Sequence, residues 1–292
     1  MTAPVKAGWL GARPAELSAP PGAPGGGDLP GQPGAGGLPA EQRAGGLPGE
    51  QGAPAVEVPP LLAALDSVRD PELDEPITAL GFVSSATITP DGDAQVRLRL
   101  PTYFCAPNFA FLMVADAYDA VSATPGVRRA EIVLEDHFAS DAINGGVAAR
   151  AGFAQSFDGE AVGELHELRA DFLRKAVMAG TDQVCRPLLA AGTDPASLPG
   201  MTLGEVPPSA ALQRLRERRA ELGLPAGDDA WLLIDPKTGE PVRPDSLRMH
   251  LGRARLTRTS LEANGSICRG MLQHRYDNTA GLGHKPQAEE DQ

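Results

Sequence analysis

The sequence predicts an α+β fold in which a small domain of the order helix, hairpin, helix, strand precedes a mostly α-helical C-terminal region. Two observations predict this class. Apolar and polar residues alternate over residues 84–100 and, less regularly, over 127–136, as in half-buried strands. Apolar residues after about residue 163 recur at three- and four-residue steps, as in helices. We therefore divide the chain into four parts: a disordered Gly/Pro-rich tail (1–56), an α+β domain (57–150), a helical extension (151–280) and a polar tail (281–292).

The N-terminal tail is dominated by Gly, Pro and Ala and contains the related stretches GGDLPGQ, GGLPAEQ and GGLPGEQ. Such a segment has too little large apolar surface to offset the entropy of ordering, so we expect it to be disordered. The sequence also shows neither the apolar core of a signal peptide near Met1 nor any run of about 18 apolar residues. We expect a cytoplasmic protein with no membrane partner.

Local signals place each element of the α+β domain. A residue that precedes proline is pushed out of the helical region, so a first short helix ends before Pro71. A Pro-Asp-Gly-Asp turn between two alternating stretches is typical of a hairpin, and proline is favourable as a first helical residue. The predicted elements are therefore a helix from Pro59, strands over 84–89 and 94–100, a helix from Pro107 to about 123, a strand over 127–136 and an irregular segment over 135–150.

The C-terminal region shows helical periodicity with two interruptions. The stretch WLLIDPKTGEPV at 231–242 predicts a short buried strand followed by a turn, since Asp, Pro and Gly supply turn chemistry. Gly223 is a typical residue after a helix end. The predicted helices run from about 163 to 192, from 209 to 222, from 245 to 257 and from 260 to 276.

The charge is concentrated in one part of the chain. The net charge is -12, and residues 57–172 alone hold 7 basic and 19 acidic side chains. This balance argues against nucleic-acid binding there and suits a cationic partner or metal delivery, while a solubilising acidic surface is the plainer alternative. The basic stretch 250–260 is more readily explained as a structural or partner-binding face than as a nucleic-acid site. We expect no nucleic-acid partner.

The stretch LPTYFCAPNF at 100–109 places Cys105 where a strand pattern gives way to a helix pattern. Unpaired N–H groups and a partial positive charge at a helix start would stabilise a thiolate there, and Thr102 can offer a hydroxyl to the same turn. Cys105 would then be a nucleophile or a soft-metal ligand. A small buried side chain that only packs is the alternative. The three cysteines form no CxxC pair, so neither a disulfide framework nor a closed structural zinc site is expected.

The order of these motifs resembles the metal-sulfur cluster assembly domain of the SufT and PaaD type. In that family an Asp-Pro-Glu leads into an Ile-x-x-Leu-Gly-x-Val stretch, and a Thr-x-x-x-Cys-Pro turn follows the hairpin. The resemblance covers about residues 58–150 and departs by placing Ala106 after the cysteine and by lacking a Pro-Pro-Trp-Thr run after the last strand. The matching residues are Asp70, Pro71, Glu72, Ile77, Leu80, Gly81, Val83, Thr102 and Cys105.

The resemblance implies a non-enzymatic accessory factor for the maturation of iron-sulfur clusters or iron centres. Cys105 would bind iron or a cluster transiently, and Asp70, Glu72 and Thr102 would support the loops beside it. The Arg-rich C-terminal extension is similar to that of actinobacterial relatives that accompany binuclear-iron monooxygenases, which implies a client metalloprotein of that kind. The alternative function is a scaffold or chaperone-like protein that has lost metal binding. A homodimer is left open as the oligomeric state.

Five further residues are candidate metal ligands. Asp136, His137 and Asp141 follow a strand and carry groups that iron accepts, although a solvated loop is the more common explanation for such residues. Cys185 and Cys268 lie in helical patterns, where core packing is the default interpretation. Convergence of all three thiols, which would leave one open cluster position, is the remaining alternative. No Ser/His/Asp order, phosphate loop or dinucleotide fingerprint is present, so an enzyme is not expected.

Overall fold

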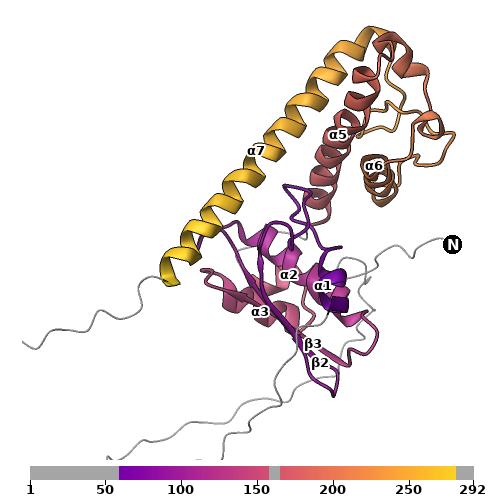
Figure 1. Ribbon diagram of the computed structural model, residues 1–292. Helices are drawn as coiled ribbons and strands as arrows, with labels where there is room; N and C mark the ends of the chain where they lie inside the picture. Colours follow the sequence, from indigo (N-terminus) through magenta and orange to yellow (C-terminus); the bar gives the residue numbers. More distant parts are fainter. Residues whose placement is uncertain (1–58, 158–164, 281–292) are drawn as a thin grey trace, which may run out of the picture.

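The computed structural model describes residues 59–157 and 165–280, and these form an α+β fold, as predicted. A small three-stranded sheet with its helices lies at one end, and the helices of the C-terminal region extend away from it (Figure 1). The predicted N-terminal and C-terminal tails lie outside the described residues, and so does the predicted start of the long helix near residue 163. No helix in the described ranges is long and apolar enough to cross a membrane.

The sheet has the order β1-β2-β3, and its strands are β1 (Val83–Ile88), β2 (Asp93–Arg99) and β3 (Arg129–Glu135). The hairpin of β1 and β2 is antiparallel, and its turn closes with a 2.9 Å bond from the Thr89 amide to the Asp93 carbonyl. Gly92 adopts φ +85° in this turn, a conformation that glycine accepts without steric cost. The pair of β2 and β3 is parallel, which requires a crossover element between them.

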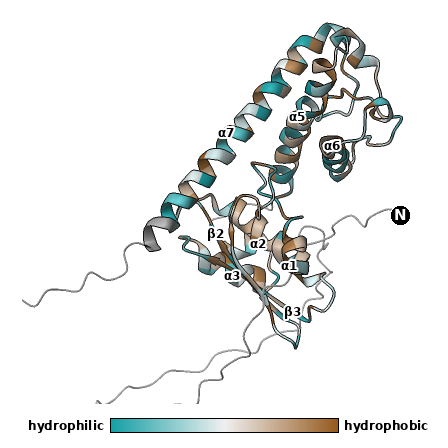
Figure 2. Cartoon of the chain, in the orientation of Figure 1, coloured by the Kyte–Doolittle hydropathy of each residue, from teal (hydrophilic) through white to brown (hydrophobic). Residues whose placement is uncertain are grey.

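Helix α2 (Pro107–Ser122) makes this crossover and covers one face of the sheet. It begins with Pro107 at its first position, as predicted. Figure 2 colours this helix mostly toward the hydrophobic end of the scale. The helix buries a run of consecutive residues, which include Phe111, Leu112 and Val114, because it also packs against α1 (Pro59–Leu65) and α3 (Ser140–Ala148).

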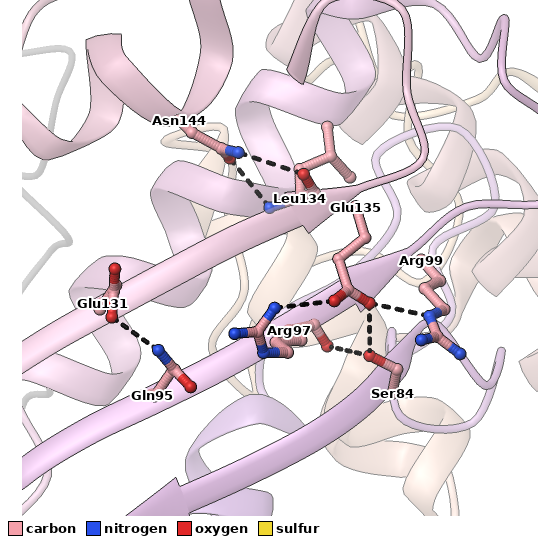
Figure 3. A network of polar contacts seen from close by, with 8 residues as sticks. All are labelled: Ser84, Gln95, Arg97, Arg99, Glu131, Leu134, Glu135 and Asn144. Atoms are coloured by element: carbon pink, nitrogen blue, oxygen red, sulfur yellow. Dashed lines mark hydrogen bonds and ion pairs between the residues drawn. The ribbon is translucent and has the colours of Figure 1, made fainter. Parts of the chain in front are cut away.

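The opposite face of the sheet carries a polar network around Glu135 at the end of β3 (Figure 3). The Glu135 carboxylate accepts bonds from Arg97 Nη1 at 2.9 Å and from Arg99 Nε at 2.8 Å. It also accepts a bond from the Ser84 hydroxyl at 3.3 Å. Partial burial raises the pKa of Glu135, but the bonds from the two arginines outweigh it and lower that pKa below its usual value. All three strands are thus linked just before the chain enters the loop that follows β3.

Helix α3 replaces part of the irregular segment that the sequence predicted over 135–150, so that prediction was wrong. Ile143 and Val147 lie one turn apart and are both buried, which gives the segment the apolar face that a helix needs. The Asn144 side chain bonds to the Leu134 backbone through both its oxygen, at 2.9 Å, and its nitrogen, at 3.1 Å (Figure 3). This clasp fastens α3 to the last strand.

The C-terminal region forms around α5 (His166–Ala190), α6 (Ala210–Glu221) and α7 (Leu247–Ala280). Helices α5 and α7 pack along each other and run in opposite directions (Figure 1). The structure shows one continuous helix where the sequence predicted two, over 245–257 and 260–276. The predicted break contained only Thr, Arg and Ser, which do not stop a helix, and Arg258 within it bonds to Asp182 of α5 at 2.6 Å. The shorter helices are α4 (Phe153–Ser156), η1 (Pro195–Gly200), η2 (Leu203–Glu205) and η3 (Pro244–Ser246).

The predicted strand at 231–242 is not formed; the segment has only isolated bridges, although its turn is present. Leu232 and Leu233 are fully buried in a second hydrophobic core. Arg219 of α6, which is itself fully buried, donates to the carbonyls of Trp231 at 2.8 Å and Leu232 at 2.6 Å. The Leu232 amide donates to the Met201 carbonyl at 2.8 Å, so a guanidinium and a neighbouring segment together satisfy the backbone there.

Candidate functional site

Cys105 lies in the turn between the end of β2 and the start of α2, where the sequence placed it. Its side chain is half-buried and packs against the first hydrophobic core, which includes α2 and the sheet. The Thr102 hydroxyl lies 3.3 Å from the Cys105 sulfur. This direct contact is consistent with the predicted support of the thiol by Thr102. The thiol is free and partly open to solvent, as a ligand or a reactive group has to be.

His137 holds the backbone of this turn in place. The side chain is 3 % exposed; its Nδ1 accepts a bond from the Ala139 amide at 3.2 Å, and its Nε2 lies 2.7 Å from the Cys105 carbonyl, to which it donates. Burial, followed by the charge of Arg275, lowers the pKa of His137 despite the bond to Cys105, which favours the neutral ring. Both ring nitrogens are thus engaged, and His137 positions Cys105 and offers no nitrogen to a metal.

The two acidic residues beside His137 are exposed. Asp136 has φ +50° and directs its carbonyl to Arg275, which donates to it at 2.6 Å. Asp141 lies in the first turn of α3. Asp136 therefore lies in an exposed loop and Asp141 in an exposed helix turn, and among the described residues neither is gathered with His137 into a metal-binding group.

Asp70 lies in a second loop, which follows α1. Its Oδ1 accepts bonds from the amides of Glu72 at 2.9 Å and Leu73 at 2.8 Å, which is the turn geometry that Asp before Pro favours. The side chain is 7 % exposed, and burial raises its pKa to about 6. Its neighbours Asp74 and Glu75 form ion pairs with Arg218 and Arg269, whereas Asp70 has no such partner within the described part of the chain.

Helix α7 brings Cys268 to these two loops. Arg269 bonds to Glu75 at 2.5 Å, and Arg275 donates to the Leu100 carbonyl at 3.0 Å. Cys268 lies between these contacts, is half-buried and packs against the same core as Cys105. Burial raises the pKa of Cys268, and the charges of Asp70, Cys105 and Glu72 raise it further, which places these four groups in one neighbourhood.

Cys185 lies elsewhere. It is 1 % exposed in the second core, among the buried side chains of α5 and α6, and burial raises the pKa of its thiol to about 12. The alternative in which all three thiols converge is therefore wrong, because only Cys105 and Cys268 share a core. Within the described ranges no three His, Cys, Asp or Glu side chains are gathered closely enough to hold a metal ion by themselves.

Sequence reasoning missed the roles of His137 and Arg275. His137 was considered as a ligand, and its contact with the Cys105 carbonyl depends on a loop that no local pattern describes. A signal for α7 was present, since Gly265, Cys268, Leu272 and Arg275 recur at three- and four-residue steps and so share one helix face. Their partner could not be deduced from that spacing.

Comparison with known proteins assigns the first part of the chain. Residues 60–132 match the model of a family described as iron-sulfur cluster assembly protein. The match supports a cluster-assembly domain in this region. The match contains Asp70, Glu72, Thr102 and Cys105, ends within β3, and leaves α5, α6 and α7 outside. No match was found among curated proteins or among solved structures. The assembly domain supports a role in iron-sulfur cluster assembly, and an accessory role more than a catalytic one.

Proposed function

We propose that this protein is an accessory factor that binds iron or an iron-sulfur cluster transiently through Cys105 and passes it to a client protein. The observation that carries the proposal is the position of Cys105, a free, half-buried thiol on a turn inside the segment that matches the assembly family. Thiolate sulfur is a soft ligand suited to iron-sulfur clusters. The iron or cluster is what the protein transfers and is not its own resident cofactor.

The surface beside Cys105 suits contact with a client. Tyr103, Phe104 and Phe138 are 48 %, 76 % and 49 % exposed, and their rings contact one another, with Tyr103 and Phe104 edge to face at 5.0 Å between centroids. Exposed aromatic side chains are enriched at protein interfaces. A client seated on this patch would approach the Cys105 thiol directly.

The helical extension offers a second docking surface. Apolar side chains at four positions along α7 are exposed among hydrophilic ones (Figure 2): Met249, Leu256, Ile267 and Met271. We propose that the client is a metalloprotein of the cytoplasm, and specifically a binuclear-iron monooxygenase component. The resemblance of the motifs around Cys105 to the SufT and PaaD type, and of the Arg-rich extension to that of monooxygenase-associated relatives, supports this choice.

The test is anaerobic reconstitution of the wild type and of Cys105→Ala with iron and sulfide, followed by iron analysis and ultraviolet-visible absorption. We expect the wild type to hold iron and the variant to lose it while its far-ultraviolet circular dichroism stays unchanged. If both proteins are folded and neither holds iron, the protein is a scaffold that has lost metal binding, and the proposal is wrong.

A further inference from the structure

One face of α7 packs against the assembly domain over three turns. Gly265 lies so close to Glu75 that an added Cβ would stand 2.5 Å from its carboxylate, and Leu272 lies 3.3 Å from the position of a Cβ on Gly81. Arg275 completes the series by donating to the carbonyls of Leu100 at 3.0 Å and Asp136 at 2.6 Å.

Cys268 belongs to this face. It follows Gly265 by three residues and precedes Leu272 by four, so its side chain projects between the contacts that those two residues make. On the assembly domain, this interval is bordered by the loop of Asp70 and Glu75 and by the loop that runs from Leu100 to Cys105. The contacts on either side therefore place the Cys268 thiol against the loops that hold Cys105 and Asp70.

The charges around the two thiols favour a cation. Asp70 is a buried carboxylate without an ion-pair partner among the described residues, and Glu72 lies beside it. Arg269, the cation nearest Cys268 on its own helix, bonds to Glu75. A metal ion placed between the thiols would offset this negative charge, because opposite charges stabilise each other most where water is excluded.

We propose that Cys268 is a second ligand of the metal that Cys105 holds, so that the helical extension, which lies outside the matched family segment, forms half of the binding site. The inference rests on the proposed function above. On binding, each thiol releases its proton to solvent as its sulfur forms a bond to the metal, and the oxidation state of the metal does not change. Two thiolates leave coordination positions free, through which the ligands of a client can take over the metal.

The experiment uses cobalt(II) as the probe and the full chain under anaerobic conditions. The wild type, Cys105→Ala, Cys268→Ala and Cys185→Ala are each alkylated with iodoacetamide, with and without cobalt(II), and every cysteine is quantified by mass spectrometry. Cys185→Ala is the matched control because that thiol is buried in the other core. Circular dichroism establishes that each variant is folded, and a serine variant at the same position replaces any alanine variant that is not.

We expect cobalt(II) to protect both Cys105 and Cys268 in the wild type and in Cys185→Ala. In each single variant at the site the remaining thiol should lose its protection, with an affinity for cobalt(II) lower by about 100-fold or more, since loss of a ligand exceeds the loss of an outer-shell group. Protection of Cys105 that persists in Cys268→Ala would overturn this inference and leave the proposed function standing. Failure of cobalt(II) to protect any thiol in the wild type, with no iron held on reconstitution, would overturn both.

Discussion

Replacement of Asp70 by Asn should stabilise the protein at neutral pH. Burial raises the pKa of Asp70 from 3.8 to about 6, so the folded state favours the protonated acid. A carboxyl group with a raised pKa contributes fully to stability below pH 4, and this contribution is lost as the pH rises through 6. Two pKa units correspond to about 3 kcal/mol of stability, at about 1.4 kcal/mol each.

The asparagine side chain removes the charge and keeps the geometry. Its oxygen can still accept the bonds that the amides of Glu72 and Leu73 donate to Asp70. The new amide N–H groups are buried in exchange, at a cost of about 1 kcal/mol. We therefore expect Asp70→Asn to raise the free energy of unfolding by about 2 kcal/mol at pH 7.5 and to lower it slightly at pH 4.

Urea unfolding followed by circular dichroism between pH 4 and pH 8 measures this difference. Asp91→Asn is the control, because the side chain of Asp91 is 87 % exposed and its ion pair with Arg128 lies at the surface. A loss of stability in Asp70→Asn at pH 7.5, or a pH dependence equal to that of the wild type, would show that the buried charge does not destabilise the fold. If the prediction holds, Asp70 is retained at a cost to stability, as is common at functional sites.

Three further predictions test other parts of the structure. His137→Ala should lower stability by about 2 kcal/mol, since the partly buried carbonyl of Cys105 loses its donor. The amount of iron bound on reconstitution should fall although Cys105 is intact, and retention of full iron would contradict the positioning role. Ser260→Pro should lower the free energy of unfolding in urea by about 3 kcal/mol relative to Ser260→Ala, because residue 260 lies inside α7. Equal stability of the two variants would indicate that a separate helix starts at residue 260. Arg219→Met should destabilise by about 2 kcal/mol, because the buried carbonyl of Leu232 and the partly buried carbonyl of Trp231 both lose their donor. Iron binding should be unchanged because the second core lies apart from Cys105, and equal stability of variant and wild type in thermal unfolding would refute the prediction.

The elements of the assembly domain were predictable because their signals are local. The Pro-Asp-Gly-Asp turn between alternating stretches specifies the hairpin, and Pro107 marks the start of α2. Cys105 was found for the same reason, since its turn occupies the junction of two recognisable patterns. Helix α3 was missed because its apolar face consists mainly of Ile143 and Val147 among small residues, which are equally common in loops.

The sequence by itself therefore determined the fold class, the hairpin, the crossover helix and the turn that carries Cys105. The tertiary structure alone decided which of the other cysteines shares its core. Cys185 and Cys268 both lie in helical patterns, yet Cys185 is enclosed in the second core, whereas Cys268 packs against the same core as Cys105. The physical reason is that helix formation depends on neighbouring residues, whereas docking of α7 depends on contacts such as Arg269 with Glu75 and Arg275 with Leu100, between residues far apart in the chain.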